Sequence, residues 1–225
     1  MNTPRARDAR AVLEDIGLEL EALKRRIVGH PYVVMLEEGR VPRSALETLA
    51  SQQYRIVTNG IRNIALILAR FGHLPSARQL AFFLQAEFAV RDAVLEFARA
   101  LGLTQETLER ARPVPEALMF SYYETFVCLY GSDADLITAF YFDAQVWIAN
   151  ARRVAQALQS KYGLSKEAVA FFEMYANYQP SPEDVVPHLQ AALERGVPED
   201  QIREATRLLL EYELRFWNAM AEVSK

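Results

Sequence analysis

Residues 133–162, DADLITAFYFDAQVWIANARRVAQALQSKY, carry apolar side chains at intervals of three and four positions, with no glycine or proline among them. This spacing gathers the apolar side chains on one face of an α-helix. The aligned positions are Leu136, Ala139, Val146, Trp147 and Val154. A helix of this length crosses a whole domain, because each residue adds about 1.5 Å. We therefore expect residues 133–162 to form a long central helix.

The rest of the chain shows the same helical spacing and no sustained alternation of polar and apolar residues, which is the pattern typical of strands. Further helices are predicted at residues 9–28, 32–38, 44–71, 80–101, 115–130, 166–178, 182–195 and 199–223. Glycines and prolines lie mostly between these segments, where they begin or end helices. The sequence thus predicts an all-α fold, a single compact bundle of about eight or nine helices that makes residues 1–225 one domain.

The composition is that of an ordinary globular chain, with 51% hydrophobic and 24% charged residues among 225. A formal net charge of -4 provides no basic surface, so we expect neither nucleic acid nor a membrane as a partner. No apolar stretch approaches the roughly 18 residues that span a bilayer, and residues 1–8 lack the apolar core of a secretory signal. These features predict a cytoplasmic protein.

Polar side chains interrupt the apolar faces of four predicted helices. They are Gln53, Glu87, Asp143 and Glu213. Burying a polar or charged group costs free energy unless the group is paired or has a task, so these positions are candidates for a functional site. We expect the four side chains to converge in one interior cavity. The aromatic residues predicted to surround that cavity are Phe120, Tyr123, Trp147 and Tyr175.

A structural interpretation competes with the functional one at several positions. Arg91 lies one turn after Glu87 and is placed to form an ion pair with it. Gln53 would be a core amide with satisfied hydrogen bonds, and Asn150 would bond to the backbone of a neighbouring helix. Cys128, the only cysteine, lies among apolar residues and is predicted to be a buried small hydrophobe rather than a nucleophile.

The histidines argue against a metal site of the usual bundle type. They are His30, His73 and His188. None falls in the Glu-x-x-His pattern that binds two irons in helical bundles, and glycine-rich phosphate loops are also missing. We therefore expect neither a metal nor a cofactor. A metal site made only of the carboxylates Glu87, Asp143 and Glu213 is the alternative.

Several stretches, in their order and spacing, resemble a known helical family over nearly the whole chain. They are HPYV at 30–33, LEEGRVP at 36–42, QQY at 52–54, FARALGL at 97–103, Gly131 twelve residues before Asp143, and ELRFWNAMA at 213–221. The chain resembles the heme-oxygenase-like family that includes thiaminase II (TenA), the last enzyme of pyrroloquinoline-quinone synthesis (PqqC) and non-heme di-iron oxidases. The resemblance implies a heme-oxygenase-like fold.

Carrying the family's functional positions over implies altered chemistry. The cysteine nucleophile of thiaminase II falls on Asp143, its active-site aspartate falls on Gln53, and its glutamate is kept as Glu213. Two of its pocket tyrosines fall on Phe120 and Trp147. For the di-iron oxidases, Glu87 is the ligand position that is kept, and residues 175–182 lack the expected histidines. The groups by which PqqC holds its polyanionic substrate have no counterparts.

Together these observations predict a pocket for a small, flat, nitrogen-containing molecule. Asp143 and Glu213 would be its acid/base pair, because two carboxyls in an apolar pocket perturb each other's pKa. Hydrolysis of an amine-bearing heterocycle without a metal is the leading hypothesis. A carboxylate-rich di-metal oxidase and a binding protein without catalysis are the alternatives. The resemblance also implies a homodimer or homotetramer, for which residues 115–130 offer an apolar surface.

Overall fold

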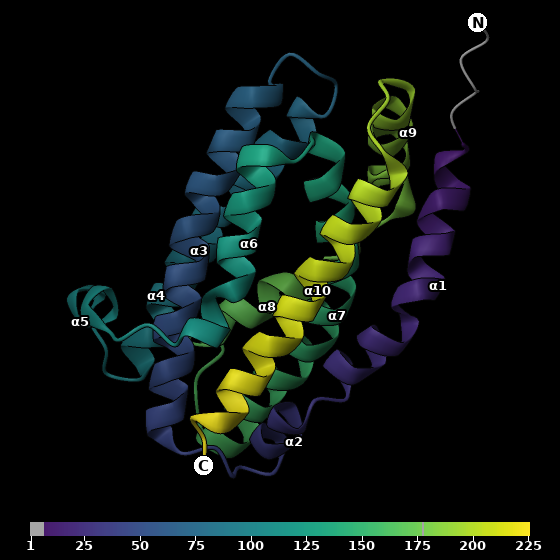
Figure 1. Cartoon of the computed structure of the whole chain (residues 1–225). Helices are drawn as coiled ribbons and strands as arrows, with labels where there is room; N and C mark the ends of the chain where they lie inside the picture. The colour runs from purple at the N-terminus through teal and green to yellow at the C-terminus, as the bar shows by residue number, and fades with distance from the viewer. Residues whose placement is uncertain (1–6, 177) are drawn as a thin grey trace, which may run out of the picture.

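A computed structural model describes residues 7–176 and 178–225 of the chain, which form ten α-helices, one short 3₁₀ helix and no strand (Figure 1). The helices are α1 (Ala9–Val28), α2 (Pro31–Glu37), α3 (Arg43–Phe71), α4 (Ala77–Ala100), α5 (Gln105–Arg110), α6 (Pro115–Tyr130), α7 (Asp133–Tyr162), α8 (Ala170–Ala176), the 3₁₀ helix η1 (Pro182–Asp184), α9 (Val186–Glu194) and α10 (Glu199–Glu222). The all-α prediction is confirmed.

The predicted boundaries agree with the structure for α1, α6 and α7 and differ elsewhere. The segment predicted as one helix over 182–195 divides into η1 and α9, because the ring of Pro187, in the first turn of α9, cannot continue a helix that begins at residue 182. Helix α5 was not predicted, since six residues are too few to show a helical period. Its start is marked by Thr104 and Thr107, whose side chains cap each other's backbone N–H.

Helix α7 begins and ends at strong capping signals. Ser132 accepts a hydrogen bond from the backbone N–H of Asp135, and the Asp135 carboxylate accepts one from the N–H of Ser132. The helix ends at Gly163, whose positive φ of 68° suits glycine. In the interior of α7, Nδ2 of Asn150 donates a 3.0 Å hydrogen bond to the carbonyl of Ile27, which confirms the predicted structural role of that amide.

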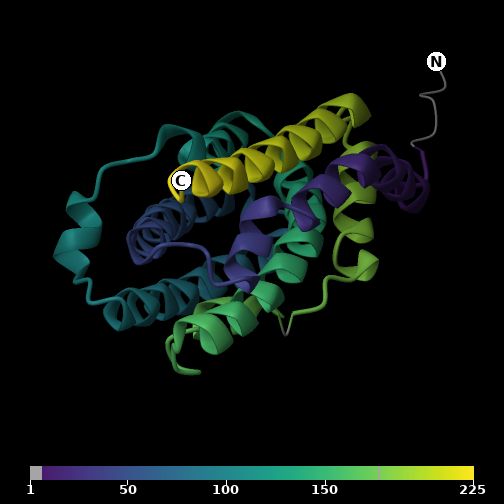
Figure 2. The ribbon, with the colours of Figure 1, turned by 90° about the horizontal axis from the view of Figure 1, so that it is seen from below.

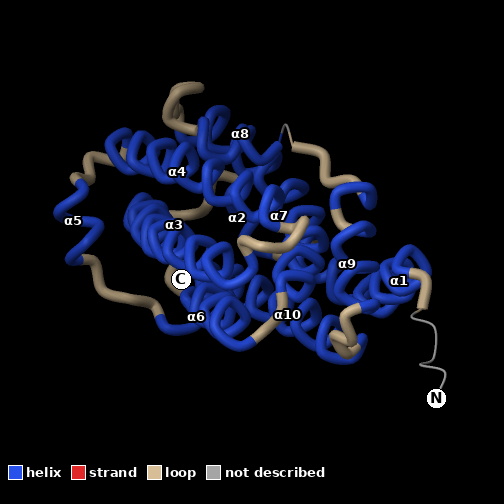
Figure 3. Tube along the Cα trace, turned by 90° about the horizontal axis from the view of Figure 1, so that it is seen from above, coloured by secondary structure: helices blue, strands red, loops and turns tan. Residues whose placement is uncertain are grey.

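The helices pack around α7 and α10 in an arrangement that Figures 2 and 3 show end on. Helix α3 packs against α4 and α6, while α10 packs against α6 and α7, and α8 covers α7 and α4. In Figure 3, α5 and α1 lie at opposite ends of the molecule. This arrangement leaves α3, α4, α6, α7, α8 and α10 facing a common interior, which holds the candidate site.

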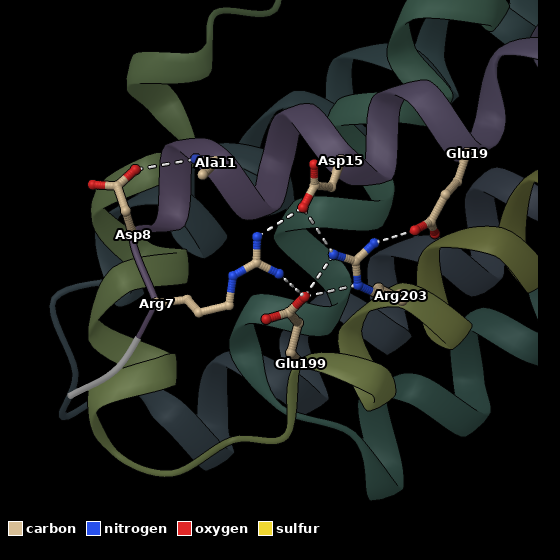
Figure 4. Close-up of polar contacts among 7 residues, drawn as sticks. All are labelled: Arg7, Asp8, Ala11, Asp15, Glu19, Glu199 and Arg203. Carbon is tan, nitrogen blue, oxygen red and sulfur yellow. Dashed lines mark hydrogen bonds and ion pairs between the residues drawn. The ribbon is translucent and has the colours of Figure 1, made fainter. Parts of the chain in front are cut away.

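An ion-pair network ties the start of α1 to the start of α10 (Figure 4). Arg7 contacts Asp15 at 2.7 Å and Glu199 at 2.8 Å, and Arg203 contacts Glu19 and Glu199 at 2.5 Å each. Single surface ion pairs contribute little, but here Arg7 contacts two carboxylates and Arg203 three, and pairs in such a network count for more. The network adds to the apolar packing at this end, where Val12 of α1 and Ile202 of α10 are fully buried.

Within the described ranges, no helix is both long and apolar enough to cross a membrane.

Candidate active site

A cavity of about 310 Å³ lies among α3, α4, α6, α7, α8 and α10. Five carboxylates line it. Asp184 of η1 is exposed, and the other four are Glu87 of α4, Glu124 of α6, Asp143 of α7 and Glu213 of α10. Much of the remaining wall is aromatic, and the described lining residues include no lysine, arginine or histidine. The cavity reaches the surface near α4 and α8, because two of its lining side chains, Phe82 and Met174, are 51% and 39% exposed.

The structure brings together seven of the eight residues predicted for this site. Those that line the cavity are Gln53, Glu87, Phe120, Asp143, Trp147, Tyr175 and Glu213. The prediction that Tyr123 lines the cavity is wrong. Its ring packs against Phe126 and Tyr212, with centroid distances of 5.8 and 5.3 Å, and it is not among the lining residues. Phe120 and Glu124 face the cavity from positions one helical turn apart on α6, and Tyr123 is rotated about 100° from Glu124 on that helix.

Asp143 and Glu213 form one carboxyl pair. Glu213 is buried, at 5% exposure, and Nε1 of Trp217 donates a 2.7 Å hydrogen bond to its Oε1. Burial and the nearby charge of Asp143 raise the pKa of Glu213 well above its usual range, and the Trp217 bond opposes this. Burial raises the pKa of Asp143 to about 7. At neutral pH, the pair therefore holds a proton that isolated carboxyls would have released.

Glu87 and Glu124 form a second carboxyl pair, against Gly60 of α3. A Cβ at Gly60 would lie 3.3 Å from Oε2 of Glu87 and 3.8 Å from Oε1 of Glu124, so the missing side chain leaves room for both carboxyls. Burial raises the pKa of each to about 8. For Glu124, the charges of Glu87 and Asp143 add to this effect, and a hydrogen bond with Asn63 opposes it. The predicted Glu87–Arg91 ion pair is wrong, because Arg91 pairs with Asp92 on the outer face of α4.

Glu124 was missed in the sequence because helix α6 is apolar nearly all round, so this carboxylate interrupts no apolar stripe. The available signal was different in kind: Glu124 is the only charged residue between Glu116 in the first turn and the end of the helix at Tyr130. Its side chain is only 2% exposed, and its Oε1 has no hydrogen-bond partner among the described residues. A single carboxylate in an otherwise apolar helix thus marks a candidate site residue, even where no apolar face is interrupted.

Tyr175 lies where the two carboxyl pairs meet. The charges of Glu87, Asp143, Glu124 and Glu213 all add to the effect of burial in raising the pKa of its hydroxyl. Its ring packs edge-on against Trp147, with centroids 5.7 Å apart. All four carboxyls therefore lie close enough to Tyr175 to raise the pKa of its hydroxyl.

The neighbouring glutamines Gln52 and Gln53 have different roles. Gln52 is the satisfied core amide: it donates to Ser51 Oγ and the carbonyl of Arg112, and accepts from the N–H of Val114. Gln53 is also buried but lines the cavity. Nε1 of Trp147, a second lining residue, is buried without a hydrogen-bond partner in the described part of the chain. The cavity wall therefore holds a donor without an internal acceptor.

Cys128 is buried on α6 and is not among the lining residues. Burial raises the pKa of its thiol, so the reactive thiolate is disfavoured. These observations agree with the prediction that Cys128 is a buried small hydrophobe.

No three His, Cys, Asp or Glu side chains of the described residues are grouped so as to hold a metal ion. Glu87, Asp143 and Glu213 share the cavity, yet they do not form such a group. We derive no catalytic step through a metal.

The sequence profile of the TENA/THI-4/PQQC family matches residues 19–223. The chain belongs to this family. No curated protein matches the chain in a search by sequence.

Solved structures show the same heme-oxygenase-like fold at low sequence identity. A TenA homologue from Pseudomonas syringae pv. tomato is 17% identical, with a TM-score of 0.78 and coverage of 93% of this chain and 92% of that one. A protein described as a TenA family transcription regulator, from Silicibacter sp. TM1040, is 21% identical, with a TM-score of 0.74 and coverage of 98% and 99%. A domain with a heme oxygenase-like fold from Shewanella denitrificans is 15% identical, with a TM-score of 0.69 and coverage of 94% and 91%.

Proposed function

We propose that this protein hydrolyses a carbon–nitrogen bond in a small, amine-bearing heterocycle, with Asp143 and Glu213 as its acid/base pair and without a metal or cofactor. The observation that carries the proposal is the placement of these two carboxyls in one cavity, close enough for the charge of Asp143 to raise the pKa of Glu213. Two carboxyls with different pKa values divide the roles of acid and base.

Asp143 is the base in this proposal, because its pKa of about 7 leaves part of it ionised at neutral pH, and Glu213 is the acid, because its pKa is raised well above its usual range. The Asp143 carboxylate accepts a proton from water, the water oxygen bonds to the ring carbon that carries the amino group, and the electron pair of the ring C=N double bond moves to the ring nitrogen. That pair then returns to restore the double bond as the bond to the amino nitrogen breaks, and the electron pair of the broken bond leaves with this nitrogen. Glu213 donates its proton to that nitrogen, which departs as ammonia, and the ring keeps a hydroxyl group.

The cavity wall supports a flat ligand with ring nitrogens. Phe120 and Trp147 offer aromatic surfaces for stacking. A ring nitrogen would accept a hydrogen bond from Nε1 of Trp147, which has no acceptor among the described residues. The amide of Gln53 would supply a further donor or acceptor at the same wall.

The test is ammonia release from a panel of amino-substituted pyrimidines, pyridines and pyrazines. We expect the wild-type protein to release ammonia from at least one of them. Asp143→Asn and Glu213→Gln should each lower the rate by about 100-fold or more. Asp200→Asn, a matched change at an exposed position of α10, should leave the rate unchanged. Release that survives both site variants contradicts the proposal.

Two other outcomes identify the alternative functions. Stoichiometric iron or manganese that a chelator removes together with activity would replace the hydrolase with a carboxylate-rich oxidase. Binding of a heterocycle by the wild type, with no ammonia released by any variant, would identify a binding protein that keeps the pocket without catalysis. Elemental analysis and native mass spectrometry of the purified protein separate these outcomes.

We propose a homodimer or homotetramer as the working form, in the cytoplasm. Helix α6 supports self-association because four large apolar side chains on it are between 42% and 72% exposed. They are Tyr122, Phe126, Leu129 and Tyr130. Contiguous exposed apolar side chains are typical of interaction surfaces.

A further inference from the structure

Apart from Asp184, which is exposed, the acid/base pair leaves two carboxyls of the cavity without a task. Glu87 and Glu124 come from α4 and α6 and meet beside Gly60, while Glu213 is held by Trp217 on α10. The cavity thus has two carboxyl pairs, and hydrolysis as proposed uses only one of them.

Glu124 is the more informative member of the unused pair. It lines the cavity, and only 2% of it is exposed to solvent. Its Oε1 accepts no hydrogen bond from any described residue. A buried carboxyl that only stabilised the fold would be paired with a cation or have both oxygens hydrogen-bonded. Without such partners, removing the group from water costs free energy that nothing compensates.

No side chain of the cavity neutralises this pair. The described lining residues include no lysine, arginine or histidine, and Arg91, the nearest candidate in sequence, pairs with Asp92 instead. In the empty cavity, burial keeps much of this pair protonated at neutral pH. A protonated amine of the ligand would let the carboxyls release those protons and would donate hydrogen bonds to their oxygens. Aromatic side chains around the carboxyls, such as Phe83 and Phe120, favour an organic cation through the negative faces of their rings.

We propose that Glu87 and Glu124 form a cation subsite that binds a second protonated nitrogen of the ligand, at a point separate from the Asp143–Glu213 pair. This inference rests on the proposed function, in that both concern one ligand in one cavity. It narrows the ligand class to small rings that carry two basic nitrogens. The ammonium group donates to Oε1 of Glu124 and to the carboxylate of Glu87, and the reacting nitrogen lies at the other pair.

A matched pair of probes tests the subsite directly. 1,4-Bis(aminomethyl)benzene carries two amines, and 4-methylbenzylamine has the same shape with one amine replaced by a methyl group. Both amines of the first probe are protonated at pH 7.5, since alkylammonium groups resemble that of lysine. Binding of each probe is measured by calorimetry and by the fluorescence of the two tryptophans.

We expect the wild-type protein to bind the diamine at least tenfold more tightly than the monoamine. Glu124→Gln, which keeps the shape of the side chain but removes its charge, should reduce this preference to below threefold. Glu87→Gln should do the same and provides a second test if the first variant folds poorly. Glu116→Gln, an exposed position on the same helix, should keep the full preference.

Each contrary result overturns the subsite: a wild type without preference for the diamine, or a preference that persists in both variants. The two proposals also fail separately. Ammonia release without diamine preference would remove the subsite and keep the hydrolase. A Glu124-dependent preference without ammonia release from any heterocycle would keep the subsite and remove the hydrolase.

Discussion

The indole Nε1 of Trp217 donates a 2.7 Å hydrogen bond to Oε1 of Glu213, one turn earlier on α10. Both side chains are buried, and the bond is the one interaction that lowers the pKa of Glu213 against burial and the charge of Asp143. It fixes one carboxyl oxygen and leaves the other to carry the proton. The geometry of the proposed acid is thus set from within its own helix.

This relationship predicts an energetic coupling between Trp217 and Glu213. Trp217→Phe and Glu213→Leu should show a coupling free energy of about 1 kcal/mol in a double-mutant cycle, the usual net value of a hydrogen bond. Urea unfolding of the four proteins measures it. Additive effects within about 0.3 kcal/mol would show that the bond contributes nothing to the folded state.

A second prediction concerns the pH dependence of stability. The folded state holds protons on Glu87 and Glu124 up to pH about 8, whereas the unfolded chain releases them near their usual pKa. Because the folded state binds more protons between these values, the free energy of unfolding falls as the pH rises from 5 to 8. Each retained proton contributes at most about 1.4 kcal/mol per pH unit to this slope.

Glu124→Gln should therefore flatten the profile and make the protein more stable than wild type at pH 8. Urea unfolding at pH 5, 6, 7 and 8 gives the slopes directly. Glu116→Gln, at an exposed position of the same helix, should reproduce the wild-type slope. A wild-type stability that is flat or rises over this range would show that the two carboxyls are ionised in the folded protein.

Substitutions at two polar positions on one face of α7 should change the stability of the protein in opposite directions. Asp143 carries a charge that burial opposes, so Asp143→Asn should raise stability above pH 7. Asn150, two turns later, donates to the carbonyl of Ile27, and Asn150→Ala should cost about 1–2 kcal/mol at every pH. Thermal unfolding at pH 6 and 8 separates the two. Loss of stability in both variants would mean that Asp143 is a structural residue.

The fold was predictable because the helical period is a local signal. Residues 133–162 show it over thirty positions, and their helix begins and ends where the sequence indicates. Where prediction failed, a local cause overrode the period: Pro187 divides the segment at 182–195, and the six residues of α5 are too few to show a repeat.

The polar residues of the site were predictable only where they stood out from an apolar face. Gln53, Glu87, Asp143 and Glu213 did so, and all four line the cavity. On a helix that is apolar nearly all round, the sequence does not show which side chains point into the interior. On α6, this lack of contrast concealed Glu124 and placed Tyr123 in the cavity, although its ring packs against Tyr212.

The exposed side of α6 gives a last prediction, on self-association. Its apolar side chains, Phe126 among them at 54% exposure, would be covered in a homodimer or homotetramer. Phe126→Arg would place an unpaired charge in that interface and should dissociate the assembly to a monomer of 25.6 kDa. Leu18→Arg, at a 76% exposed apolar position of α1, is the matched control and should leave the mass unchanged. Light scattering after size exclusion measures each mass. A wild-type monomer, or an assembly that Phe126→Arg leaves intact, would show that this face is not the interface.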